Sequence, residues 1–334
     1  RGKKNDGINF IKQALKKGAT KIVSSRASRD FKNKIVKIFS EKEFLNKFAM
    51  RKRDFTDAKI LAITGSAGKT SLKNLLKNLL QNFGSTLSSP RSYNNHYGVP
   101  LSLSQLNTEN KYGIFEVGMS KKGEINKLSK LIKPDFGLIT NIGEAHMENF
   151  KNLKGIADAK GELINNIKKN GVLFLNYDDK FFHYLRKKAK LKNLKVVSFG
   201  INKKSDVHPV LASKKQNKYI DAIKVKDQLL KLQFNNLNIY NVLASLAVLK
   251  ELDLDLQKII ETYKNFTPSE GRGKILNIKR YQKKFKLIDE SYNANPISVK
   301  NAIQKLGSIK KQKFKKYLLL GDMLELGQKS EILH

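Results

Sequence analysis

The chain has 334 residues, carries 66 basic and 29 acidic side chains, and contains no cysteine. Its length suffices for two or three domains, and the lack of cysteine excludes disulfides and thiolate metal sites. A net charge of +37 would suit nucleic-acid or membrane-surface binding. However, only 9 of the 66 basic residues are Arg, and Lys is spread along the whole chain. We therefore expect no nucleic-acid role, and no apolar run reaches the length of a membrane span.

Residues 1–55 are basic and too few to make a full domain, so we expect them to be the end of one. The pattern predicts a helix over Asn9–Lys17 and a strand at Lys21–Val23. No apolar segment of signal-peptide type follows the basic start. A reducing compartment fits the absence of cysteine.

From Thr56 to about Phe266, apolar strands alternate with helical patterns. This alternation predicts an α/β fold, with a parallel sheet and helices on both faces. A hairpin is expected in Tyr219–Phe234 and an amphipathic helix at Asn238–Leu252. The predicted strands are Ile60–Ile63, Tyr112–Val117, Phe136–Thr140, Val172–Leu175 and Val196–Phe199.

A third unit follows Pro268–Gly273, which has the composition of a linker. Two strands are expected at Lys274–Ile278 and Phe285–Asp289, then a helix from Pro296 and a strand at Tyr317–Leu320. We expect this unit, like the first, to be incomplete.

Residues 59–70 predict a phosphate-binding loop. An apolar strand leads into a glycine turn, then into Lys69 and Thr70, and then into a helix with apolar residues at helical spacing. In this layout backbone N–H groups face phosphates, the lysine reaches the terminal phosphates, and the threonine hydroxyl binds Mg²⁺. The loop is shorter than the common P-loop, because that pattern needs glycine where Ile63 stands.

Three further groups lie downstream, near the ends of the predicted strands. Glu116 ends one strand, His146 follows another, and Lys160 lies on a predicted helix. Each alone has an ordinary explanation: a solvated strand end, a loop histidine, one lysine among many. Ligands gather at the carboxyl ends of strands in an open parallel sheet. Together with the phosphate loop, the three groups therefore favour a functional site.

The order of these motifs resembles the Mur ligase and folylpolyglutamate synthase superfamily. Within it, Asp289–Pro296 and Leu320–Gly327 are similar to the Mur ligase that adds a dipeptide to the peptidoglycan precursor. That resemblance covers essentially the whole chain. The other motifs that carry it are Thr64–Thr70, Asn94–Leu101, Glu116–Gly118, Gly123–Ile125, Thr140–His146 and Ala159–Glu162.

The resemblance implies a three-domain Mur ligase architecture: a partial N-terminal UDP-substrate domain at 1–55, a central ATP-binding domain at 56–268, and the start of a truncated Rossmann-like C-terminal domain at 269–334. It implies ATP and Mg²⁺ as cofactors. It also implies UDP-N-acetylmuramoyl-tripeptide and D-alanyl-D-alanine as substrates, and a monomer in the bacterial cytoplasm.

The resemblance further assigns roles to residues. Thr70 and Glu116 would bind one Mg²⁺, and His146 and Lys160, the latter carbamylated, a second. Lys69, His146 and Lys160 would be catalytic, and Asn95 would approach the muramoyl substrate. The implied ATP contacts are Gly65, Ser66, Ala67, Gly68, Lys69, Thr70, Asn241, Arg272, Asp289, Asn293 and Asn295.

One departure from the family concerns the adenine side of the nucleotide. The usual Gly-x-His-Asn-x-x-Asn pattern is Asn-Asn-Leu-Asn-Ile-Tyr-Asn at residues 235–241, so the Gly and His are missing. Another Mur ligase, a folylpolyglutamate synthase-like ligase and a non-catalytic nucleotide-binding paralogue are the alternative interpretations. Whether the third residue of the acceptor is diaminopimelate or lysine is left open.

Overall fold

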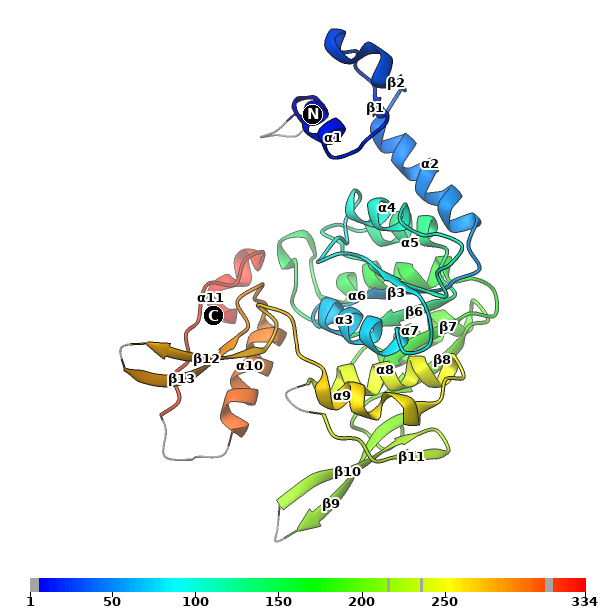
Figure 1. Ribbon diagram of the computed structural model, residues 1–334. Coiled ribbons are helices and arrows are strands. Elements are labelled where there is room, and N and C mark those ends of the chain that lie inside the picture. Colours follow the sequence, from blue (N-terminus) through cyan, green and yellow to red (C-terminus); the bar gives the residue numbers. More distant parts are fainter. Residues whose placement is uncertain (1–5, 215–216, 235–236, 281, 310–314) are drawn as a thin grey trace.

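The computed structural model describes residues 6–214, 217–234, 237–280, 282–309 and 315–334 (Figure 1). Its largest feature is a nine-stranded sheet in the order β11-β10-β9-β8-β7-β6-β3-β5-β4. Strands β3 to β9 are joined by parallel pairs, while β9–β10 and β10–β11 are antiparallel. The strands are β3 (Lys59–Thr64), β4 (Thr86–Ser88), β5 (Tyr112–Glu116), β6 (Phe136–Ile139), β7 (Val172–Asn176), β8 (Lys195–Phe199), β9 (Val207–Lys214), β10 (Asn217–Val225) and β11 (Gln228–Leu230). The predicted α/β class is confirmed.

Helices cover both faces of this sheet. In β3, Leu61 and Ile63 join one buried cluster and Ile60 and Ala62 join another, because successive side chains of a strand point to opposite faces. The first cluster is completed by α3 (Lys69–Leu80), α8 (Ile239–Glu251), η5 (Leu256–Ile259) and α9 (Ile260–Asn265). The second is completed by α4 (Gly98–Leu103), α5 (Glu124–Ile132), η3 (Met147–Asn149), α6 (Leu153–Gly161), η4 (Glu162–Asn166) and α7 (Phe182–Lys190).

The antiparallel edge of the sheet is larger than the predicted hairpin. Strands β10 and β11 form that hairpin, but β10 also pairs along its length with β9, which the sequence did not indicate. Pro209 lies inside β9, opposite Ile223. Proline cannot donate a ladder hydrogen bond and is unusual inside a strand, so its presence hid this element.

The N-terminal part lies apart from the sheet, beyond a long helix (Figure 1). Two short parallel strands pair there, and the expected helix and strand are present. The elements are η1 (Gly7–Phe10), α1 (Ile11–Lys16), β1 (Ile22–Ser24), η2 (Arg29–Lys34), β2 (Ile35–Lys37) and α2 (Glu41–Asp54).

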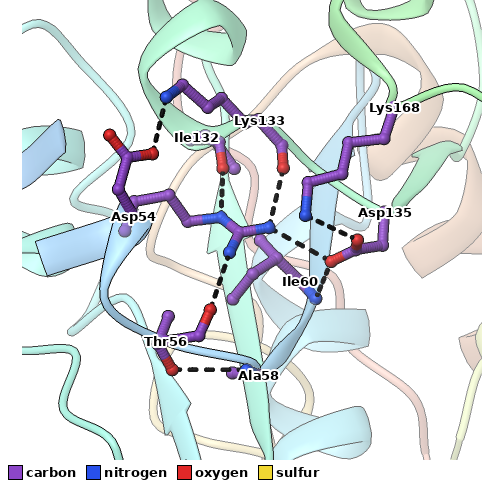
Figure 2. Close-up of polar contacts among 9 residues, drawn as sticks. Asp54, Thr56, Ala58, Ile60, Ile132, Lys133, Asp135 and Lys168 are labelled. Carbon is purple, nitrogen blue, oxygen red and sulfur yellow. Dashed lines mark hydrogen bonds and ion pairs between the residues drawn. The ribbon is translucent and has the colours of Figure 1, made fainter. Parts of the chain in front are cut away.

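The last turn of α2 is fixed to the central sheet by Arg53, which is buried. Its guanidinium donates to the carbonyl oxygens of Ile132 and Lys133, both at 2.9 Å, and of Thr56 at 3.3 Å. It also pairs with Asp135 at 3.2 Å. Figure 2 shows these partners around the amino ends of β3 and β6. One side chain therefore joins α2 to the end of α5 and to Asp135, which precedes β6 and accepts from Ile60 N of β3 at 2.8 Å.

The C-terminal part contains a hairpin, β12 (Lys274–Arg280) and β13 (Lys283–Asp289), followed by α10 (Pro296–Ser308), η6 (Gly327–Lys329) and α11 (Ser330–Leu333). Helix α10 begins with a reciprocal capping box between Asn295 and Ser298. The strand predicted at Tyr317–Leu320 is wrong, because these residues pair with no strand. Among the described residues, no helix combines the length and apolar character needed to cross a bilayer.

Candidate active site

The phosphate loop connects β3 to α3, as predicted. Gly65 has φ +145°, and a Cβ placed on it would lie 1.9 Å from the Thr140 hydroxyl oxygen. Gly68 has φ +83°, which favours glycine, and it precedes the first residue of α3. The first N–H groups of a helix have no partner within the helix. The loop therefore delivers the backbone donors of α3 to the carboxyl edge of the sheet.

The segment after β6 holds the loop in place. Ser66 N donates to Asn141 O at 3.0 Å, and Ala67 N donates to Asn141 Oδ1 at 2.9 Å. In return, the Thr140 hydroxyl donates to Ala67 O at 2.6 Å. These bonds fix the middle of the loop before any ligand arrives, which is the preorganisation that a phosphate site needs.

Thr70 and Glu116 meet beside the loop. The Thr70 hydroxyl donates to Glu116 Oε2 at 2.7 Å, and Asn94 Nδ2 donates to Glu116 Oε1 at 2.7 Å. Glu116 is buried at the end of β5. A hydroxyl and a carboxylate are hard oxygen donors of the kind Mg²⁺ prefers. In the described part of the chain no three His, Asp or Glu side chains cluster.

Two lysines contribute to the electrostatics of this region, and Lys69 is half-buried. Lys69 Nζ donates to Gly65 O at 2.8 Å. Burial lowers the pKa of Lys69, and Arg272 adds to that effect while Glu116 opposes it. Lys160, on α6, is buried. Burial and the charge of Lys69 hold the pKa of Lys160 well below its usual range. Desolvation thus disfavours the charged form of both amines, and an anion such as a nucleotide phosphate would favour it again.

His146 is influenced by the charges of Lys69 and Lys160, and it contacts Glu325 of the C-terminal part. Its Nδ1 is 2.5 Å from Glu325 Oε2. Burial lowers the pKa of His146; the charges of Lys160 and Lys69 act in the same direction, and Glu325 opposes them. A neutral imidazole is the form that binds a metal.

The link to the C-terminal part also brings residues to the loop. Arg272 donates to the Ser92 hydroxyl at 3.2 Å, and this hydroxyl lies 3.3 Å from the Thr70 hydroxyl. Asn295 Nδ2 donates to Ser66 O at 3.3 Å. Asn241, on α8, also lies beside the loop, because its Oδ1 would be 3.4 Å from a Cβ added to Gly68.

Two predicted site residues are engaged by other groups, and a third is exposed. Asp289 accepts hydrogen bonds from Gly271 N at 2.8 Å and from the Ser291 hydroxyl at 2.6 Å. The bonds from Ser291, followed by that from Gly271, lower the pKa of Asp289. Asn95 accepts from the backbone at the start of α4, and Asn293 is exposed. Their nucleotide or substrate contacts stay predictions.

Lys73 was not predicted as a site residue, but it is fully buried beside Glu116. The spacing of residues in the helix after the phosphate loop could have indicated this burial. Lys73 lies three residues after Thr70 and three before Leu76, on the inner stripe of α3 with the apolar residues. A lysine in such a stripe is rarely buried without a partner. Ser92 and Glu325 were missed as well, and their contacts depend on distant parts of the chain.

This arrangement agrees with comparisons to known proteins. Residues 63–249 match the model of the Mur ligase middle domain. The match covers more than half of the chain, and the chain belongs to the Mur ligase family.

The relatives point to one branch of that family. The UDP-N-acetylmuramoyl-tripeptide–D-alanyl-D-alanine ligase of Rickettsia prowazekii is 34% identical, over 98% of this chain and 73% of its own length. The crystal structure of MurF from Acinetobacter baumannii has a TM-score of 0.85 at 29% identity, covering 100% of this chain and 72% of that one. The MurF ligase of Thermotoga maritima in complex with ADP has a TM-score of 0.82 at 28% identity, covering 100% and 75%.

Proposed function

We propose that this protein is an ATP-dependent ligase that joins D-alanyl-D-alanine to UDP-N-acetylmuramoyl-tripeptide during peptidoglycan precursor synthesis. The observation that carries the proposal is the buried Thr70–Glu116 pair next to the phosphate loop, in a chain similar over its length to ligases of that name. A nucleotide-binding paralogue without activity would have no need of Lys160 at the same site.

The chemistry explains why a nucleotide and cations are needed. A carboxylate is a poor electrophile, so the γ-phosphoryl group of ATP first moves to an oxygen of the acceptor carboxylate, and the bond to ADP breaks. The amine of the dipeptide then attacks the acyl carbon, the C–O bond breaks, and phosphate leaves as the amine loses a proton. Phosphoryl transfer depends mainly on positioning and on neutralising charge. We assign Lys69 and the N-terminus of α3 to holding the phosphates.

We assign Thr70 and Glu116 to one Mg²⁺, and His146 and Lys160 to a second. The metal ions would supply positive charge against the phosphates and the acceptor carboxylate. Lys160 would serve as a carbamate, because Mg²⁺ prefers oxygen ligands and repels an ammonium. Reaction with CO₂ needs a neutral amine, and the low pKa of Lys160 favours that form.

The remaining assignments follow from the same family membership. We propose that the segments 1–55, 56–268 and 269–334 belong to the substrate, ATP-binding and C-terminal ligase domains. We also propose that Arg272, Asn241 and Asn295 contact the nucleotide, and that the protein acts as a monomer in the cytoplasm, where ATP is available.

The decisive experiment is phosphate release from ATP with the two substrates added singly and together. We expect release only when D-alanyl-D-alanine and a UDP-linked tripeptide are both present. Acceptors ending in diaminopimelate and in lysine form parallel arms and determine which third residue is used. Glutamate addition to a folate without dipeptide addition would overturn the proposal.

A further inference from the structure

Lys73 is a fully buried lysine that contacts one loop and the carboxylate of Glu116. Its Nζ donates to Ser89 O at 2.7 Å and to Arg91 O, and lies 3.9 Å from Glu116 Oε2. Burying an ammonium is costly unless its donors are satisfied. Here two backbone carbonyl groups and a carboxylate satisfy them.

The backbone of this loop is shaped to meet the lysine. Arg91 has φ +45°, a left-handed conformation that is uncommon for a side chain of this size. Such a conformation persists only where surrounding contacts hold it. The carbonyl of Arg91 is one of the two that accept from Lys73, so the lysine is one of the contacts that hold this turn.

The same loop carries the side chains that surround the proposed metal ligands. The Ser89 hydroxyl accepts from Glu116 N at 3.0 Å. The Ser92 hydroxyl lies between Thr70 and Arg272. Asn94 donates to Glu116 Oε1. The segment from residue 89 to 94 therefore contacts the carboxylate, the threonine hydroxyl and the arginine of the C-terminal link.

We propose that Lys73 is a positioning residue that fastens residues 89–94 to α3 and so orients Glu116 toward Thr70. Lys73 holds the loop through backbone carbonyl groups, and the loop holds the carboxylate through Asn94 and Ser89. The role in catalysis rests on the function proposed above, whereas the role in loop order does not.

A lysine that served only the stability of the fold would behave differently. Its loss would lower the melting temperature without a specific effect on the loop or on the Mg²⁺ requirement. Lys77 provides the matched control, because it lies one turn further along α3 and is only half-buried.

The first test measures amide hydrogen exchange in nucleotide-free protein, without added metal. In Lys73→Met we expect residues 89–94 to exchange about tenfold faster, because loops open more often when few contacts hold them. Lys77→Met should keep the wild-type exchange rates. Unchanged exchange of residues 89–94 in Lys73→Met would overturn the proposal, whatever the enzyme's activity.

The second test uses kinetics and binding. Displacing a positioned group typically costs about ten- to a hundredfold in rate, so we expect kcat of Lys73→Met to fall by that amount and the half-maximal Mg²⁺ concentration to rise. Calorimetry should show weaker binding of ADP with Mg²⁺, and Lys73→Arg, which keeps donors for both carbonyl groups, should regain part of each loss. If Lys73→Met does not fold, Lys73→Gln takes its place in both tests.

A lower melting temperature with wild-type kcat and Mg²⁺ dependence would reduce Lys73 to a structural role. A wild type inactive on both substrates would refute the proposed function, and the exchange test would still decide the role of Lys73.

Discussion

Both ends of the central sheet bury cationic side chains, but in different ways. At the amino ends of the strands, Arg53 has three carbonyl groups and Asp135 as partners (Figure 2). At the carboxyl ends, desolvation lowers the pKa of the half-buried Lys69 and of the buried Lys160, and the charge of Lys69 lowers the pKa of Lys160 further. A cation surrounded by acceptors stabilises the fold, whereas lysines whose charged form is disfavoured by desolvation suit a site that receives a polyanion.

The strongest test of this contrast is Lys69→Ala. Losing one charge contact to the transferring phosphate typically costs roughly 10² to 10³ in rate. We expect a loss of that size in phosphate release, with no drop in melting temperature, because partial desolvation of this ammonium does not favour folding. Turnover like that of the wild type would contradict the assignment of the phosphate loop.

Lys160→Ala should remove most activity as well. The variant lacks the oxygen ligand that a carbamate would supply, and acetate or propionate added to the assay should fill the vacated space and restore part of the rate. Lys154→Ala, an exposed lysine on the same helix, should keep full activity. Normal activity in Lys160→Ala would exclude Lys160 as a metal ligand.

Arg53→Met should lower the stability of the fold and leave the activity unchanged, which is the opposite of the effect expected for the lysine variants. Removing one partner from a buried polar network costs about 3 kcal/mol, and urea unfolding should show that loss in the free energy of unfolding. Phosphate release at a temperature where the variant is folded should match the wild type. Arg51→Met, on the exposed side of the same helix, is the control, and a folded Arg53→Met with a large loss of turnover would break the contrast between the two ends.

Lys133→Met should produce the smallest effect. The ion pair of Lys133 with Asp54 measures 2.6 Å, but the side chains are 40% and 52% exposed. Exposed pairs contribute less than about 1 kcal/mol, so the midpoint of urea unfolding should hardly change. A loss comparable to that of Arg53→Met would mean that this edge depends on surface charge rather than on the buried guanidinium.

The sequence predicted those parts of the protein that depend on local spacing. Strand β3, the glycine loop and α3 follow one another within about 20 residues, so periodicity and turn chemistry sufficed to place them. Glu116, His146 and Lys160 were found because each lies near the end of a predicted strand or on a recognisable motif.

Two kinds of feature were not predicted: a strand with an atypical sequence, and contacts that depend on distant partners. Strand β9 lies next to β10 in the chain but contains Pro209, and the expected strand at Tyr317–Leu320 failed because apolar residues alone do not supply a partner strand. The roles of Arg53 and Lys73 were hidden for a similar reason. Each resembles any other basic residue in a Lys-rich chain until the carbonyl groups from other segments surround it.

Helix α2 is attached at both ends, so it connects the N-terminal part to the central sheet. Arg53 fixes its last turn to the sheet, and Glu41 in its first turn accepts from Ser25 N at 2.7 Å, beside β1. Fourteen residues at 1.5 Å each make a rod of about 21 Å. Because both ends of α2 are attached, the two parts of the protein move together with the helix. A tilt of about 10° at its base would carry the tip and the attached strands by about 4 Å. The position of the N-terminal strands relative to the central sheet therefore depends on the angle of this one helix.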